Sequence, residues 1–203
     1  MSTAFQTEPF VVSGGFRPEH RTQAAVAYWR AFSRKLLYPL GPEEKAISFL
    51  QDVLDPSHAI SAVSKDGEFL GMAGFKSPQG ALVGGGLRDL ARAYGWVGAT
   101  LRGGLIQFLE RKCSHGTLLM DGIFVEPAAR GQGVGTALLN AIETYAAREG
   151  FQQIRLDVID TNPRARALYE RLGFSERTVM PLGPLKSVFG FSTATEMTKR
   201  VVR

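Results

Sequence analysis

Apolar and polar residues alternate with two different periods along the N-terminal half of the chain. Short apolar runs are typical of strands, whereas apolar residues three or four positions apart are typical of helices. This pattern predicts an opening strand, two helices and a β-hairpin over residues 10–12, 25–36, 47–54, 59–64 and 69–75. The first helix is expected to break within 39–42, which holds two prolines, and Lys65-Asp66-Gly67-Glu68 supplies the turn of the hairpin.

The stretch 81–112 combines helical spacing with an unusual number of glycines. Leu87 and Tyr94 fall on one side of a helix, as do Val97 and Leu101. Seven glycines punctuate these residues. A glycine inside a helix costs about 1 kcal/mol relative to alanine. We therefore expect a Gly-rich insert of one or two helices that are either mobile or closely packed.

The C-terminal half alternates strands with helices. A strand, a strongly amphipathic helix, a second strand, a short helix and two further strand-like runs are predicted over 118–125, 133–148, 154–159, 163–172, 174–179 and 189–198. Gly150 and Gly173 follow the two helices, where a C-terminal glycine is expected. No repeat or linker separates the elements, so residues 1–203 are predicted to form one α/β domain.

Composition removes several classes of protein. The chain is 44% hydrophobic and 21% charged, a balance typical of soluble globular proteins and not of disordered or fibrous ones. Its single cysteine, Cys113, excludes an intramolecular disulfide framework. The three histidines, His20, His58 and His115, lie far apart without the spacing of metal ligands, so no metal is expected.

The N-terminal residues do not have the pattern of a secretory signal. The most apolar stretch, 93–109, is short and interrupted by Arg102, so no membrane span is predicted and the expected location is the cytoplasm. Residues 101–203 carry 14 basic and 10 acidic side chains, and most of the basic ones are arginine. Arginine suits phosphate recognition, so a phosphorylated cofactor, a nucleic acid and a merely solvated basic surface are all explanations for this charge.

A strand that runs through a glycine-rich turn into a helix is the most informative segment, at 123–136. Glycines let a ligand approach the backbone, and the first N–H groups of a helix have no internal partner. Together they make a cradle for a pyrophosphate. Gly135 is followed by Thr136 without the lysine of a P-loop, and Thr136 stands where a dinucleotide fingerprint needs a third glycine. A purely structural turn is the alternative.

A second motif follows the strand at 154–159. Arg-x-x-Gly-x-Gly at 130–135 and Asn-x-x-Ala-x-x-Leu-Tyr-x-x-x-Gly-Phe at 162–174 together resemble the GNAT superfamily of acetyl-CoA-dependent N-acetyltransferases. The resemblance is close over 118–174, and the motifs have the order and spacing of that family. It implies an α/β (α+β) fold with a mixed, mostly antiparallel central sheet of about six to seven strands and helices on both faces. The sheet would splay at an acetyl-CoA cleft.

The resemblance also places the co-substrate, acetyl-CoA. Its pantetheine would pair with the end of the 118–125 strand, and its pyrophosphate would meet the backbone N–H groups of the glycine turn. Arg164 and Arg166 are candidates for the 3′-phosphate, with a solvated helix face as an equal alternative. The residues assigned to the cofactor are Ile123, Phe124, Val125, Arg130, Gly131, Gln132, Gly133, Val134, Gly135, Thr136, Asn162 and Arg166.

Acetyl transfer to an amine needs a neutral amine, a stabilised oxyanion and a protonated or tolerated thiolate. Tyr169 resembles the family's general acid, and with a phenol pKa near 10 its proton transfer to the thiolate would cost at most about 2 kcal/mol. A packed helix tyrosine that only bonds the sulfur is the alternative. The backbone N–H of Val125 is the candidate oxyanion partner.

Asp121 is the first candidate for the base. It precedes Val125 by four residues, so both side chains are expected on one face of a regular strand. An aspartate pKa near 4 makes direct proton abstraction poor, so a water relay or a role as anchor for the substrate ammonium is expected. Asp160 is the second candidate. Cys113 is not expected to form an acyl-enzyme.

The leading function is therefore an N-acetyltransferase that acts on a primary amine of a small molecule or peptide by direct attack in a ternary complex. A non-catalytic acetyl-CoA-binding regulator with the same fold is the alternative. A nucleic-acid partner is not expected, because no basic stripe is interleaved with aromatic residues. The insert at 81–112 is expected to form a lid or wall of the acceptor site, with a homodimer surface or simple extra packing as the alternative.

Overall fold

A mixed sheet forms the centre of the computed structural model, which describes residues 9–109, 114–183, 186 and 190–202. Cys113 and the end of the predicted insert lie outside these residues. The strands are β1 (Phe10–Gly14), β2 (Ala59–Ser64), β3 (Phe69–Ser77), β4 (Gly80–Ala81), β5 (Thr117–Val125), β6 (Gln153–Ile159), β7 (Ser175–Pro181) and β8 (Thr193–Arg200). Their order is β1-β2-β3-β5-β6-β8-β7, and β4, which the sequence pattern did not predict, pairs with β3.

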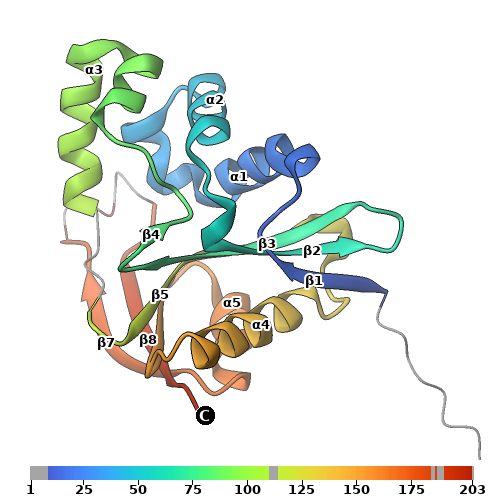
Figure 1. Ribbon diagram of the computed structural model, residues 1–203. Coiled ribbons are helices and arrows are strands. Elements are labelled where there is room, and N and C mark those ends of the chain that lie inside the picture. The colour runs from blue at the N-terminus through green and yellow to red at the C-terminus, as the bar shows by residue number, and fades with distance from the viewer. Residues whose placement is uncertain (1–8, 110–113, 184–185, 187–189, 203) are drawn as a thin grey trace, which may run out of the picture.

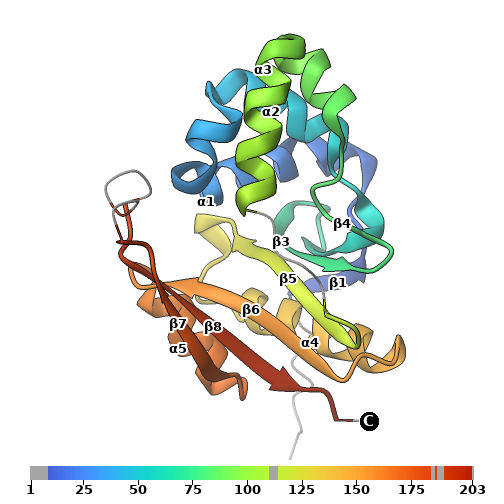
Figure 2. The same cartoon turned by 90° about the vertical axis from the view of Figure 1, so that its left-hand side faces the viewer.

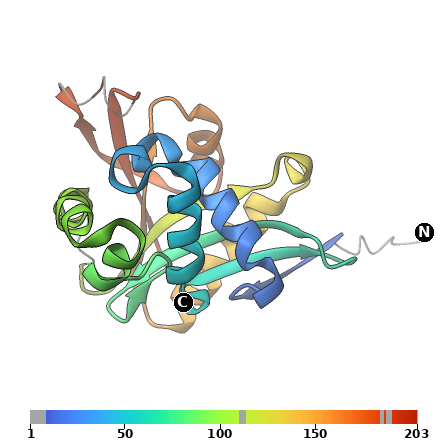
Figure 3. The ribbon, with the colours of Figure 1, turned by 90° about the horizontal axis from the view of Figure 1, so that it is seen from above.

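Helices cover both faces of this sheet, as the resemblance implied (Figure 1). The helices are α1 (Arg21–Leu40), α2 (Glu43–Val53), α3 (Leu87–Leu109), α4 (Val134–Arg148) and α5 (Pro163–Arg171). The first three lie on one face, where α1 and α2 cross the sheet (Figure 3), and α4 and α5 lie on the other. Two clusters of buried apolar side chains result, one on each face.

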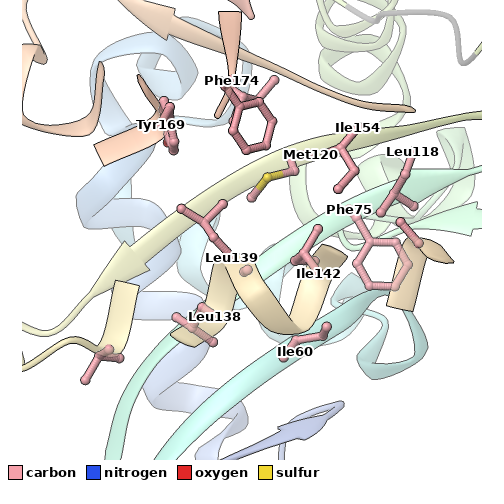
Figure 4. Packing of buried hydrophobic residues seen from close by; sticks show 14 of the residues in the cluster. Ile60, Phe75, Leu118, Met120, Leu138, Leu139, Ile142, Ile154, Tyr169 and Phe174 are labelled. Carbon is pink, nitrogen blue, oxygen red and sulfur yellow. The ribbon is translucent and has the colours of Figure 1, made fainter. Parts of the chain in front are cut away.

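The core on the α4 side joins both halves of the sheet. Leu118 and Met120 of β5, Ile154 of β6 and Leu138 and Ile142 of α4 pack together there (Figure 4). The spacing of four residues between the two α4 side chains puts them on one helical face. Both side chains therefore lie on the buried side of α4.

The sheet splits between β5 and β6. These strands are parallel neighbours, but they pair only from Thr117 to Leu119 on β5, against Gln153 to Arg155 on β6. Beyond those residues the two strands diverge (Figure 2). The predicted splay is therefore present, and it leaves the last part of β5 unpaired on the side that faces away from β3.

Helix α1 ends inside the predicted break, and α3 closes its end. Pro39 lies in the last turn of α1, and the following Gly41 has an extended backbone. The Tyr94 hydroxyl donates a hydrogen bond to the Leu40 carbonyl, and Arg102 Nη1 donates to the Tyr38 carbonyl over 3.1 Å. These bonds satisfy carbonyl groups that a helix end leaves without intrahelical partners.

Helix α3 occupies the Gly-rich insert and bends at Gly95, whose φ is +71°. It packs against α1 and α2. Among its described side chains, Leu87, Trp96, Val97 and Leu101 are apolar and exposed. Within the described residues, no helix has the length and apolar character needed to span a membrane.

Candidate active site

The turn between β5 and α4 has the backbone geometry of an anion cradle. Gly131 and Gly133 have φ values of +79° and +85°, a conformation that side chains other than glycine rarely adopt. A Cβ at either position would meet no protein atom within 4 Å, so the backbone there faces open space. Gly133 is the N-cap of α4 and provides no side-chain cap for the N–H groups that follow. These groups fit a pyrophosphate.

Two side chains hold the turn in shape. Arg130 Nε donates to the Val125 carbonyl over 3.1 Å, and Gln132 Nε2 donates to the Ala128 carbonyl over 2.9 Å. Both residues were predicted to offer their backbone N–H groups to the cofactor. Their side chains brace the loop. The backbone N–H of Arg130 is also engaged there, because it donates to the Pro127 carbonyl over 3.3 Å.

The two sequence motifs meet at Gly135. A Cβ there would lie 3.3 Å from Leu168 Cδ2 of α5 and 3.8 Å from Val125 Cγ2 of β5. The first turn of α4 therefore packs between the end of β5 and α5. Val134, whose side chain is only 1% exposed, anchors the same turn in the core.

The hydrogen bonds at the end of β5 set the direction of its backbone groups. The Glu126 N–H donates to the Leu70 carbonyl of β3 over 2.8 Å. Successive N–H groups of a strand point to opposite sides, so the Val125 N–H points away from β3 and into the split. The Val125 carbonyl accepts from Arg130, as noted above. This orientation fits the predicted oxyanion role of Val125.

The expectation that Asp121 and Val125 share a face of a regular strand is wrong. Phe75 pairs with Met120 and the adjacent Gly74 pairs with Gly122, so Asp121 is an additional residue at a β-bulge. A bulge breaks the alternation of side chains along a strand. Val125 packs on the core of the α4 side. The charge of Asp121, by contrast, affects the pKa of a phenol on the α1 side.

That phenol belongs to Tyr28 of α1. Burial raises the pKa of Tyr28 well above its ordinary value, and the negative charge of Asp121 raises the same pKa further. Phe32 lies one turn on, with its ring 4.7 Å from that of Tyr28 and its tip against Gly122 of the bulge. The sequence marks Tyr28 and Phe32 as apolar positions of α1, but it holds no signal that they face Asp121.

Tyr169 of α5 is 7% exposed and packs beside Phe174, with ring centroids 5.9 Å apart (Figure 4). Burial raises the pKa of its phenol to about 12. The value of 10 expected from the sequence is therefore too low for this site. The hydroxyl stays protonated throughout the neutral range and can act as a hydrogen-bond donor.

The other motif residues of α5 have partners within the chain. Asn162 is the N-cap, and its Oδ1 accepts from the Ala165 N–H over 3.2 Å. Arg166 donates to Glu170 over 2.9 Å and to Glu176 over 2.6 Å. Hydrogen bonds to Glu176 and Glu170 raise the pKa of this guanidinium. Contact of Arg166 with a 3′-phosphate stays a prediction, and a phosphate there would meet two carboxylates.

Asp160, the second candidate base, has a structural task. Its carboxylate accepts hydrogen bonds from the backbone N–H groups of Ser192 and Thr193, at 3.0 and 3.1 Å. These bonds tie the end of β6 to the start of β8. These bonds favour a structural role for Asp160, and Asp121 stays the first candidate for the base.

One further pair links α1 to the glycine turn. Arg30 Nη1 lies 3.2 Å from Glu126 Oε2, and both residues line a small cavity of about 60 Å³ at the end of β5. Glu126 is expected from sequence to be loop surface, and Arg30 carries no sequence signal for this position. Their contact joins α1 to the residue that follows Val125.

The split sheet and the glycine turn define the chain as a protein of the GNAT fold. The family model described as "Acetyltransferase (GNAT) family" matches residues 23–174, more than half of the chain. The chain therefore belongs to the acetyltransferase (GNAT) family.

Curated relatives match part of the chain. A thialysine N-ε-acetyltransferase from Bos taurus is 35% identical over 75 residues, which are 37% of this chain and 44% of the relative. The uncharacterized N-acetyltransferase YhfO from Bacillus subtilis is 38% identical over 60 residues, 30% of this chain and 40% of the relative. The chain thus spans less than half the length of these relatives.

Solved structures match nearly the whole chain. A GCN5-related N-acetyltransferase from Kribbella flavida matches with a TM-score of 0.62 at 21% identity. The match covers 95% of this chain and 98% of the Kribbella chain. The ribosomal-protein-S18-alanine N-acetyltransferase from Escherichia coli has a TM-score of 0.58 at 17% identity, with 96% and 95% covered. At this identity the likeness shows the fold.

Proposed function

We propose that the protein is an N-acetyltransferase that moves an acetyl group from acetyl-CoA to a primary amine by direct attack in a ternary complex. The observation that carries this proposal is the meeting of three elements at Gly135. The unpaired edge of β5, the open glycine turn and the helix of Tyr169 come together there. A thioester held along that edge would have a backbone N–H, an anion cradle and a phenol within one site.

The reaction requires little from the protein beyond placement and proton transfer. The neutral amine nitrogen attacks the thioester carbonyl carbon, and the Val125 N–H donates to the oxygen that becomes negative. Asp121, acting through a water molecule, takes the proton that the amine nitrogen loses. The C–S bond then breaks, and the sulfur receives a proton or hydrogen bond from the Tyr169 hydroxyl. The products are the acetylated amine and CoA.

The buried position of Tyr169 limits how that last step proceeds. A phenol of pKa about 12 is a weaker acid than a free phenol. Full transfer of its proton to a thiolate, with a thiol pKa of about 8.5, costs about 5 kcal/mol. Donation of a hydrogen bond to the developing thiolate, with proton transfer completed only as CoA leaves, avoids most of this cost.

The acceptor is proposed only as a class, a primary amine of a small molecule or peptide. By its name, one relative acts on thialysine, and a structural neighbour acts on an alanine of a ribosomal protein. Tyr28, Phe32 and Asp121 border the bulge of β5 on the α1 side and are the residues that would receive the amine. Helix α3 has three open roles, as a lid or wall of this site, as a homodimer surface or as simple extra packing on α1 and α2.

Calorimetric titration with acetyl-CoA tests the cofactor site. We compare the protein with Gly133→Asp and Gly133→Asn, which impose the same backbone strain and differ by one negative charge. Aspartate and asparagine are the side chains that best tolerate a positive φ. We expect the aspartate variant to bind acetyl-CoA at least about tenfold more weakly than the asparagine variant, because its charge repels the pyrophosphate. Equal affinities would remove the pyrophosphate from this turn.

Turnover distinguishes the enzyme from a non-catalytic regulator. We would measure the release of CoA thiol from acetyl-CoA in the presence of a panel of primary amines. Amine-dependent release supports the transferase. Tight acetyl-CoA binding without release for any amine in the panel would favour the regulator.

A further inference from the structure

A cavity of about 600 Å³ lies at the opposite end of α4 from the glycine turn. Its walls come from β1, from the turn Pro56–His58 with the first residues of β2, and from the C-terminal half of α4. Among the described residues that line it, none belongs to β5, to the glycine turn or to α5. The cavity is therefore separate from the proposed acetyl-CoA site.

The cavity exists because small residues occupy its walls. Gly14, Ala59 and Ala141 leave space between the edge of the sheet and α4, and a Cβ at Gly14 would meet nothing within 4 Å. The floor is apolar. Ile60 and Phe75 form it, and both belong to the buried cluster around Ile142 (Figure 4).

An aromatic pair and one cation stand at the side of this floor. The Tyr145 ring lies 4.6 Å from that of Phe75, measured between centroids. The Arg148 guanidinium carbon lies 5.5 Å from the Tyr145 centroid. Arg148 is the only charged residue among the described residues that line the cavity.

The Arg148 guanidinium and the Tyr145 hydroxyl can both donate hydrogen bonds to a ligand. Arg148 uses Nε for an exposed contact of 3.0 Å with Glu149, which leaves its two Nη groups for an anion. Exposed pairs of this kind contribute little to stability, so the guanidinium can turn toward a ligand at small cost. Burial first, and then the charge of Glu149, raises the pKa of the Tyr145 phenol, which keeps its hydroxyl a donor.

We propose that this cavity binds a small monocarboxylate with a flat apolar body, of the class of aromatic acids. The guanidinium fork matches a carboxylate, and the Tyr145 ring, backed by the fully buried Phe75 ring, matches a flat body. The volume lies within the range of small-molecule sites. A ligand with several negative charges does not fit, because the lining supplies a single cation. This site does not depend on the proposed acetyl transfer.

Backbone NMR of the full chain with benzoate as the probe tests the proposal. We expect saturable shifts of the Gly14, Ala141, Tyr145 and Arg148 amides, with a dissociation constant on the order of 1 mM. Benzamide has the same shape without the charge and should bind about tenfold more weakly. Saturating acetyl-CoA should leave benzoate binding unchanged.

Two variants assign the binding to the cavity. Arg148→Gln should weaken benzoate about tenfold, whereas Arg171→Gln, which changes the last-turn arginine of α5, should leave it unchanged. Ala141→Leu fills the cavity from a helix position and should abolish binding at unchanged melting temperature. The proposal is overturned by absent shifts at about 20 mM benzoate, by shifts confined to residues 130–136, by displacement with acetyl-CoA, or by equal binding to Arg148→Gln.

Discussion

Burial decides what each titratable side chain of the candidate site can do. Tyr169 and Tyr28 both lie in apolar clusters, and burial raises the pKa of both phenols. A phenol in such a place is a permanent donor and not a base. Asp160 is not buried, but its carboxylate already accepts hydrogen bonds from two backbone N–H groups. Tyr169 and Asp121 therefore remain the side chains that we propose for acetyl transfer.

Replacing Tyr169 by phenylalanine removes the hydroxyl and preserves the packing against Phe174. We expect kcat to fall about 100-fold, because the departing thiolate loses its donor. KM for acetyl-CoA should change less than about twofold, since the ring remains. Steady-state kinetics beside the exposed Tyr38→Phe measure this. Unchanged kcat would make Tyr169 a packed helix tyrosine.

Replacing Asp121 by asparagine removes the charge at the bulge. We expect kcat/KM for the amine to fall about 10- to 100-fold, and the Tyr28 pKa to fall because a neighbouring negative charge is lost. Rate measurements give the first quantity, and ultraviolet titration of tyrosine ionisation gives the second. A shifted Tyr28 titration with unchanged kcat/KM would show that Asp121 neighbours the phenol without taking part in the reaction. Asp160→Asn is the control and should leave kcat/KM unchanged.

At the scale of elements, the sequence predicts a helix or strand well where apolar residues recur at a regular spacing. It fails where a single additional residue interrupts that spacing. The amphipathic helix predicted at 133–148 is present as α4, at Val134–Arg148. The bulge at Asp121 does not follow from the sequence, because an additional residue in a strand leaves the apolar composition unchanged and only reverses the faces. The sequence also does not predict the contact of α1 with that bulge, because this contact depends on how α1 crosses the sheet.

The close approach of β3 and β5 depends on Gly71. A Cβ there would lie 2.6 Å from the Phe124 carbonyl oxygen and 3.1 Å from Val125 Cα, both backbone atoms that cannot move independently. We expect Gly71→Ala to lower the free energy of unfolding by about 1–3 kcal/mol and to weaken acetyl-CoA binding through a displaced β5. Urea denaturation and calorimetry measure the two effects.

Gly86→Ala is the matched control for that change. A Cβ at Gly86 meets nothing within 4 Å, and its φ is not positive. Its stability should change by less than about 1 kcal/mol. If Gly71→Ala is as stable as Gly86→Ala, the spacing of β3 and β5 is more adaptable than the close contacts imply.

At the scale of the whole molecule, the arginine surplus of the C-terminal half has an internal use. Arg155 lies 2.7 Å from Glu196, and Arg166 lies 2.6 Å from Glu176. These pairs connect β6 to β8 and α5 to β7, in the part of the sheet beyond the split. Phosphate binding is one explanation for this charge along the sequence, whereas the fold pairs part of it with carboxylates of neighbouring elements.

The pKa of Tyr169 also links stability to alkaline pH. The phenol ionises near pH 10 in the unfolded chain and near 12 in the folded one. Between these values the unfolded state binds fewer protons, so stability falls as pH rises. The full contribution is present below pH 10, and roughly 2–3 kcal/mol is lost as pH rises through 12.

Urea denaturation between pH 9 and 12 measures this loss, with Tyr169→Phe as the reference. The difference in unfolding free energy between the two proteins should be constant below about pH 10 and shrink above it, because phenylalanine cannot ionise. Other groups, among them Tyr28, titrate in both proteins and cancel in the difference. A difference that stays constant to pH 12 would mean that the Tyr169 hydroxyl reaches solvent. The hydroxyl would then be an ordinary phenol, and complete proton transfer to the thiolate would cost about 2 kcal/mol instead of about 5.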